Sequence, residues 1–156
     1  MPPRVRRVVD VLAAHGQDSD VRFLPESVRT AAAAADALDV EVGAIANSLV
    51  FDAGGSPVLV LTSGAHRVDV AALAAAWDLP PLRRASPDFV RDHTGQPIGG
   101  VAPVGHPEAL RTYVDVALAD HDVVWAAAGH PQSVFATSFD GLVRLTGGTP
   151  TIVTGA

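Results

Sequence analysis

The chain has 156 residues, a length typical of one domain, and a chain of this size buries roughly 70% of the surface that it exposes when unfolded. Hydrophobic residues make up 48% of it and charged residues 18%, which favours a globular fold over disorder. We therefore expect a single domain over residues 1–156. The formal net charge of −6 argues against a protein that holds DNA or other nucleic acid through a broad cationic surface, and leaves room only for a local patch of arginines.

Two residue types are missing from the composition. All 11 basic residues are arginines, and the chain contains no lysine and no cysteine. Without lysine there is no Schiff base, no pyridoxal phosphate anchor and no Walker A phosphate loop. Without cysteine there are no thiol nucleophiles, thiolate metal sites or disulfides. No apolar stretch approaches the roughly 20 residues of a membrane helix and no signal-peptide pattern is present, so we expect no membrane association and a cytoplasmic location.

The N-terminal part of the chain predicts two helices and a short strand. Apolar residues recur at helical spacing over residues 4–15, and Gly16 follows where a helix C-cap belongs. Residues 21–24 alternate as in a short strand. Thr30 precedes an alanine-rich segment, residues 31–38, which predicts a helix with a threonine N-cap.

The middle of the chain predicts a hairpin followed by two helices. Residues 44–51 and 58–62 are rich in Val, Leu and Ile, and the Gly-Gly-containing spacer 52–57 is typical of a hairpin loop. Helical spacing over residues 70–77 predicts the next helix. Ser86 and Pro87 are typical of an N-cap and first helical position, and predict a helix that runs to Asp92.

A glycine- and proline-rich segment, residues 94–107, separates these elements from a second group of strands. Strands are predicted over residues 111–118, 123–128 and 133–137, then a helix capped by Ser138 and ended by Gly147, and a last strand over residues 151–153. Helices and strands mix without strict β-α-β alternation. The pattern favours an α+β fold, with a mixed, largely antiparallel sheet surrounded by helices.

The glycine segment is the sharpest candidate for chemistry. Gly99 and Gly100 would let a ligand approach main-chain N–H groups closely, as an oxyanion or carbonyl cradle requires, while Pro103 would stiffen the loop. A tight corner between sheets explains the same composition equally well. The six histidines lack metal-ligand spacing, so we expect no metal. His106 and His130 remain candidates because each lies beside glycine and proline in a loop.

Four segments together resemble a known family. Residues 46–51 (ANSLVF), 99–105 (GGVAPVG), 124–130 (VWAAAGH) and 140–146 (DGLVRLT) resemble, in order and spacing, the YbaK/ProX family of trans-editing aminoacyl-tRNA deacylases. That family is related to the insertion domain of bacterial prolyl-tRNA synthetases. The most specific piece is Gly-x-x-x-Pro, here Gly99 to Pro103. The resemblance implies a partly barrel-like mixed sheet wrapped by helices.

The chain departs from the family pattern at two places. Active members usually carry a lysine where this chain has Asn47, and a serine where it has Ala127. Asparagine can donate and accept hydrogen bonds, but it brings no charge to attract a phosphate.

The resemblance implies hydrolysis of the ester between a small noncognate amino acid and the 3′ end of a tRNA, with no cofactor. The partner would be aminoacyl-tRNA, which a synthetase or an elongation factor could present. The residues expected to contact the ester or the terminal nucleotide are Gly99, Gly100, Val101 and Asn47. Those expected to shape or rim the pocket are Pro103, Ser48, Phe23, Leu49, His106, Gly129 and His130.

Two other functions stay open. The first is a binding module that holds an aminoacyl end, a nucleotide or a partner without turnover, which the changes at Asn47 and Ala127 favour. The second is an esterase that acts on small molecules and not on tRNA.

Overall fold

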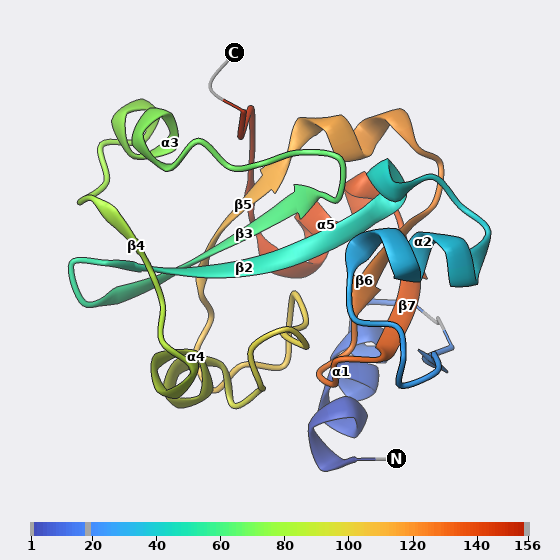
Figure 1. Cartoon of the computed structure of the whole chain (residues 1–156). Coiled ribbons are helices and arrows are strands. Elements are labelled where there is room, and N and C mark those ends of the chain that lie inside the picture. Colours follow the sequence, from blue (N-terminus) through green and yellow to red (C-terminus); the bar gives the residue numbers. More distant parts are fainter. Residues whose placement is uncertain (1, 18–19, 155–156) are drawn as a thin grey trace.

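The computed structural model describes residues 2–17 and 20–154 and contains one mixed sheet of eight strands with helices packed around it (Figure 1). Among these residues, no helix is long and apolar enough to cross a membrane. The elements in chain order are α1 (Pro3–Ala14), β1 (Arg22–Phe23), α2 (Ala31–Leu38), η1 (Val42–Ala44), β2 (Ile45–Ala53), β3 (Ser56–Ser63), α3 (Val70–Ala76), β4 (Leu82–Arg84), α4 (Pro87–Thr94), β5 (Arg111–Asp115), η2 (Val116–Asp120), β6 (Val124–Ala127), β7 (Ser133–Thr137), α5 (Phe139–Thr146) and β8 (Thr149–Thr151).

The long hairpin of β2 and β3 forms the middle of the sheet (Figure 1). The strand order is β1-β7-β6-β2-β3-β5-β8, with β4 also paired to β2. The pairs β1–β7, β6–β7, β2–β3 and β2–β4 are antiparallel, whereas β2–β6, β3–β5 and β5–β8 are parallel. The sheet is therefore mixed and mostly antiparallel, as the sequence predicts. It stays open, with β1 and β8 at its edges.

Helix starts follow the predicted capping residues. The Thr30 hydroxyl accepts a hydrogen bond from the Ala33 N–H at 3.0 Å, and Ser86 and Ser138 cap α4 and α5 in the same way. Gly147 follows α5 with φ +64°, a conformation that glycine adopts readily. These local contacts explain why the bounds of α2, α4 and α5 agree closely with the prediction.

The strand predicted over residues 111–118 is wrong beyond Asp115. There the Asp115 carboxylate accepts a hydrogen bond from the Ala117 N–H at 3.0 Å and starts the 3-10 turn η2. The hairpin loop is also shorter than the predicted spacer 52–57, since only Gly54 and Gly55 lie between β2 and β3. Both have positive φ, as a two-residue type I′ turn requires.

Two strands near the ends of the sheet also differ from prediction. The last strand is Thr149–Thr151 and not 151–153, because the chain joins β5 directly after the helix ends at Gly147. The sequence prediction missed β4, which has three residues and pairs with Phe51–Ala53 of β2. This short strand matters because it borders the site described below.

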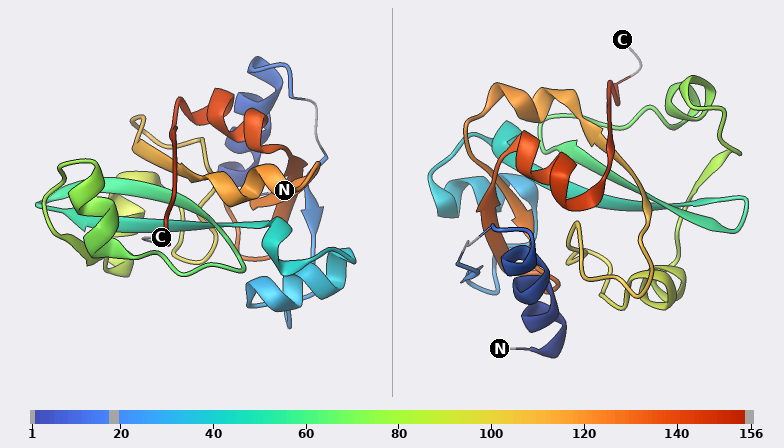
Figure 2. Two further views of the ribbon diagram at one scale, coloured as in Figure 1. Left: turned by 90° about the horizontal axis from the view of Figure 1, so that it is seen from above. Right: turned by 180° about the vertical axis from the view of Figure 1, so that it is seen from behind.

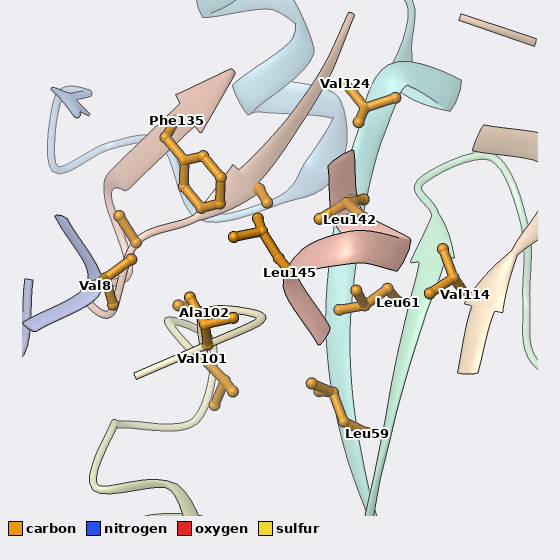
Figure 3. Close-up of a cluster of buried hydrophobic side chains, with 14 of the residues drawn as sticks. Val8, Leu59, Leu61, Val101, Ala102, Val114, Val124, Phe135, Leu142 and Leu145 are labelled. Atoms are coloured by element: carbon orange, nitrogen blue, oxygen red, sulfur yellow. The ribbon is translucent and has the colours of Figure 1, made fainter. Parts of the chain in front are cut away.

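The main core lies between the sheet and helices α1 and α5 (Figure 3). Phe135, Leu61 and Leu142 are completely buried in it, and Val101 and Ala102 bring the glycine-rich segment into the same cluster. Figure 2 shows α2 on the opposite side of the molecule from α1 and α5. There Ala34 and Leu38 of α2, with other residues, form a separate cluster on β2 and β7. The two clusters contact the N-terminal part of β2 from opposite faces, through Ile45 on one face and Ala46 on the other.

Candidate functional site

Strand β2 has a gap along one edge. Strand β3 pairs with residues 46–53 on one side. On the other side β6 pairs only with residues 45–46 and β4 only with residues 51–53. Residues 47–50 therefore have no strand partner there, and a cleft of about 920 Å³ opens beside them. Backbone N–H and C=O groups in a strand point alternately to its two edges, so some of those at 47–50 face this gap.

Side chains at 47–50 alternate between the two faces of β2. Ile45 belongs to the apolar cluster of α2, so Asn47, two residues later, faces the side of that helix. Val50 packs against the main core, which includes Val90 and Val101, so Ser48 faces the side of α4 and the glycine-rich segment. The cleft therefore borders both faces of β2. We call these the Asn47 side and the Ser48 side.

In the part of the chain that the structure describes, the charged side chains that line the cleft are all cationic. They are Arg29 before α2, Arg67 after β3 and Arg84 at the end of β4. No described aspartate or glutamate lines the cleft, although the chain as a whole has a net charge of −6. Among the described residues, none of the three arginines forms an ion pair. The cleft thus offers an anionic ligand guanidinium groups that are not paired with a carboxylate in the described residues, although Nε of Arg29 donates to the Glu26 carbonyl at 3.4 Å.

Three neighbouring residues of β2 that the sequence predicts for the site line this cleft: Asn47, Ser48 and Leu49. The Ser48 hydroxyl oxygen is buried and is the one buried side-chain oxygen or nitrogen in the described residues without a hydrogen-bond partner. Leaving a buried hydroxyl unpaired carries a free-energy penalty of about 1–3 kcal/mol. A ligand in the cleft that hydrogen bonds to Ser48 would remove that penalty.

The glycine-rich segment reaches the cleft through Ile98, Gly99 and Val101. Gly100 does not line it. Its N–H donates to the Pro97 carbonyl at 3.0 Å, and a Cβ at this position would lie only 2.6 Å from the backbone nitrogen of Pro131. Glycine is therefore required at position 100 by close backbone packing. In the described residues the N–H groups of Gly99 and Val101 have no hydrogen-bond partner, and both residues line the cleft.

Gln96 holds this segment in shape and was missed by the sequence prediction. Its side chain is buried, with Oε1 accepting from the Ala102 N–H at 2.6 Å and Nε2 donating to the Val104 carbonyl at 3.1 Å. These bonds span the predicted Gly-x-x-x-Pro motif and fix its course. From the sequence, a glutamine between a glycine and a proline cannot be recognised as a buried hydrogen-bonding residue, because a solvent-exposed glutamine would give the same pattern.

Pro103 and His106, which the sequence also predicts for the site, border a second, smaller cavity of about 230 Å³. His106 Nε2 donates to the Ala102 carbonyl at 2.8 Å. Burial lowers the pKa of His106 below its ordinary value, the hydrogen bond to Ala102 opposes this shift, and the positive charge of Arg7 adds to it. This histidine thus belongs to the packing around α1 and not to the cleft.

The remaining predicted residues lie around the turn between β6 and β7. The Gly129 carbonyl accepts a hydrogen bond from Arg4 Nε at 2.6 Å, which ties the turn to α1. His130 Nδ1 accepts from the Gln132 N–H, and its ring meets Phe23 edge-on at 6.0 Å between centroids. Phe23, Gly129 and His130 do not line the cleft, whereas their neighbour Pro131 does.

His66 is a cleft residue that the sequence prediction did not select. Its Nδ1 lies 2.9 Å from Oδ2 of Asp115, which is buried at 1% exposure. The two residues are 49 positions apart, so their spacing gave no signal. Separately, no three His, Cys, Asp or Glu side chains in the part of the chain that the structure describes are grouped so as to hold a metal ion.

Known proteins resemble this chain in sequence and in structure. A solved structure assigned as a candidate trans-editing enzyme for prolyl tRNA synthetase superposes with a TM-score of 0.92 at 40% identity, covering 99% of this chain and 98% of its own. Another, a hypothetical protein called APE2540, has a TM-score of 0.84 at 27% identity, covering 94% of this chain and 98% of its own.

Two curated proteins match over most of this chain. The uncharacterised protein YwhH of Bacillus subtilis is 31% identical over 118 residues, which is 75% of this chain and 74% of YwhH. A proline–tRNA ligase of Levilactobacillus brevis is 29% identical over 108 residues, which is 69% of this chain but only 19% of the ligase. The family model for the aminoacyl-tRNA editing domain matches residues 25–145. The chain therefore belongs to the aminoacyl-tRNA editing domain family.

Proposed function

We propose that this chain hydrolyses the ester bond between a small noncognate amino acid and the 3′ end of a tRNA, and does so as a separate protein. The observation that carries the proposal is the cleft around the open edge of β2, whose charged lining residues are all arginines in a chain of net charge −6. Such a cleft favours an anionic ligand, such as a phosphodiester, over a neutral ester. The family to which the chain belongs supports tRNA as that ligand.

The two sides of the cleft fit the two ends of this substrate. On the Asn47 side, Arg29 and Arg67 are available to phosphates of the terminal nucleotides, and the Asn47 amide can hydrogen bond to them. The Ser48 side is lined by apolar residues of α4 and the glycine-rich segment, among them Val90 and Val101. These would receive an amino acid side chain.

The ester carbonyl would then lie between the two sides, at the open edge of β2. The N–H groups of Gly99 and Val101 and the Ser48 hydroxyl, none of which has a partner in the described residues, are donors available to it there. Donors fixed in advance towards a developing oxyanion stabilise the transition state more than the ground state. Water then attacks the carbonyl carbon, the bond to the ribose oxygen breaks, and the free amino acid and intact tRNA leave.

A binding module without turnover is the second candidate, because Asn47 and Ala127 replace residues usual in active relatives and both line the cleft. The two functions differ in a panel experiment. Purified protein is mixed with tRNAs that each carry one small radiolabelled amino acid, and the fraction of ester remaining is followed in time. Faster loss for at least one small noncognate amino acid supports the enzyme. Slower loss than in buffer, through protection, supports the binding module.

A further inference from the structure

The imidazole of His66 is held in one orientation by a buried carboxylate. Oδ2 of Asp115 accepts hydrogen bonds from the Ser63 N–H at 3.0 Å and from His66 Nδ1 at 2.9 Å, while Oδ1 accepts from the Ala117 N–H. Because a carboxylate in this environment acts as an acceptor, Nδ1 carries the proton of the neutral ring. The lone pair of the ring is then on Nε2, which has no partner among the described residues.

Among the described residues, His66 is also the one histidine that lines the cleft, and histidine is the side chain that most often acts as a general base. The three arginines stay protonated throughout the physiological range. None of the aspartates, glutamates and tyrosines within residues 2–17 and 20–154 lines the cleft, and the chain has no lysine or cysteine. A proton taken up by a cleft side chain during the reaction therefore goes to His66.

The position of His66 connects it to the open edge of β2. Asn47 lies directly opposite Thr62 in the β2–β3 register, and the Thr62 hydroxyl is 3.4 Å from the same Asp115 oxygen that holds His66. Asn47, Thr62 and His66 all line the cleft. The imidazole thus belongs to the Asn47 side, with one third of its side chain exposed to solvent.

We propose that His66 is the general base of this site and that Asp115 is its positioning residue, an inference that rests on the proposed function. Nε2 of His66 accepts a proton from water as the water oxygen bonds to the ester carbonyl carbon. When the tetrahedral intermediate collapses, the bond to the ribose oxygen breaks and that oxygen takes the proton from Nε2. The amino acid leaves as a carboxylic acid, which releases its own proton to solvent, and the imidazole is neutral again.

The charged groups near His66 set the expected pH dependence. They are Asp115, the adjacent Arg67, and the pair of His121 and Glu41 beyond Ser63, whose closest atoms are 3.9 Å apart. Only the neutral imidazole can accept a proton. The value of kcat should therefore rise with pH and then level off, as general-base catalysis requires.

The test compares single variants of the full chain on the mischarged tRNA that the wild-type protein hydrolyses best. His66→Gln and His66→Ala should lower kcat by about 10²–10⁴-fold, change KM by only a few-fold and abolish the rise of kcat with pH. Added imidazole should restore part of the activity of His66→Ala. His121→Gln is the matched control, since it removes another carboxylate-paired histidine that does not line the cleft. It should keep the wild-type profile.

Asp115 also begins η2, so its variant needs a control for folding. Asp115→Asn should retain wild-type circular dichroism, lower kcat less than His66→Ala does, and shift the rise of kcat to a different pH. A merely structural role for the pair predicts instead a lower melting temperature with no change in the pH profile and no rescue by imidazole.

Two results would overturn the assignment. One is a His66→Ala protein with wild-type kcat and pH profile. The other is a His66→Ala protein whose KM rises while its kcat and pH profile stay those of the wild type. His66 would then contact the nucleic acid and not the attacking water. Failure of the proposed function can be told apart from failure of the base assignment, because the wild-type protein itself would then release no amino acid from any charged tRNA. In that case the assignment of His66 as a general base fails as well.

Discussion

Replacing Gly100 with alanine tests whether the glycine-rich segment is held by backbone packing. An added Cβ would lie 2.6 Å from Pro131 N and 2.7 Å from His130 C, against an ordinary contact of 3.4 Å or more. These are backbone atoms and cannot rotate away. The segment must therefore withdraw by about 0.8 Å, the difference between 3.4 and 2.6 Å. Overpacking of this kind destabilises by about 1–3 kcal/mol, and we expect the upper half of that range.

The loss is measured by thermal and urea unfolding followed by circular dichroism. At about 2–4 °C per kcal/mol for a chain of this length, the melting temperature of Gly100→Ala should fall by about 5–10 °C with an unchanged urea m-value. Withdrawal also moves Gly99 and Val101, so kcat/KM for the charged tRNA should fall by about 10–100-fold.

Gly99→Ala is the stability control from the same segment. No atom lies within 4 Å of a Cβ there, so its loss, about 1–2 kcal/mol, comes from the positive φ of +85° alone. A Gly100→Ala protein that melts with the wild type and keeps full activity would refute the packing argument.

Three further predictions concern charge. Asn47→Lys should tighten binding of charged tRNA most at low salt, whereas equal affinity at every salt concentration would mean that position 47 does not face a phosphate. Arg84→Gln, but not Arg83→Gln on the same strand, should weaken tRNA binding and reduce the slope of log affinity against log salt by about 0.7, because only Arg84 lines the cleft. Burial lowers the pKa of His106 in the folded state, so as the pH falls the imidazole takes up a proton in the unfolded chain before it does so in the folded chain. The contribution of neutral His106 to the free energy of unfolding is therefore fully present above about pH 6.5, and it is lost as the pH falls towards the pKa of His106 in the folded state. In urea titrations between pH 7.5 and 5.5, the free energy of unfolding should fall less for His106→Gln than for the wild type.

Local signals in the sequence predict the helices well because their determinants are local. Thr30 and Ser138 each cap their helix through a bond to a residue three positions on, which a sequence pattern can detect. The end of β5 could not be predicted in this way. Asp115 turns the chain because it is buried against residues of β3, and that burial depends on the complete sheet.

The residues of the site likewise differ in whether local sequence or strand topology places them. The family-like segments predict Asn47 and Gly99, which lie on different elements and both line the cleft. The open edge that creates the cleft depends on the unpredicted strand β4 and on the parallel pairing of β6 with β2. His66 and Asp115 meet across the β3–β5 pairing, which also follows from topology and not from spacing.

The central claim is that the cleft performs multiple turnovers on the aminoacyl end of tRNA. Its most direct test is the amount of free amino acid released per mole of protein when tRNA charged with a small noncognate amino acid is in at least tenfold excess. We expect release of many equivalents at a constant rate, with the tRNA recovered intact and able to be charged again. Release that never exceeds the uncatalysed rate in buffer, with charged tRNA bound mole for mole and protected, would contradict it.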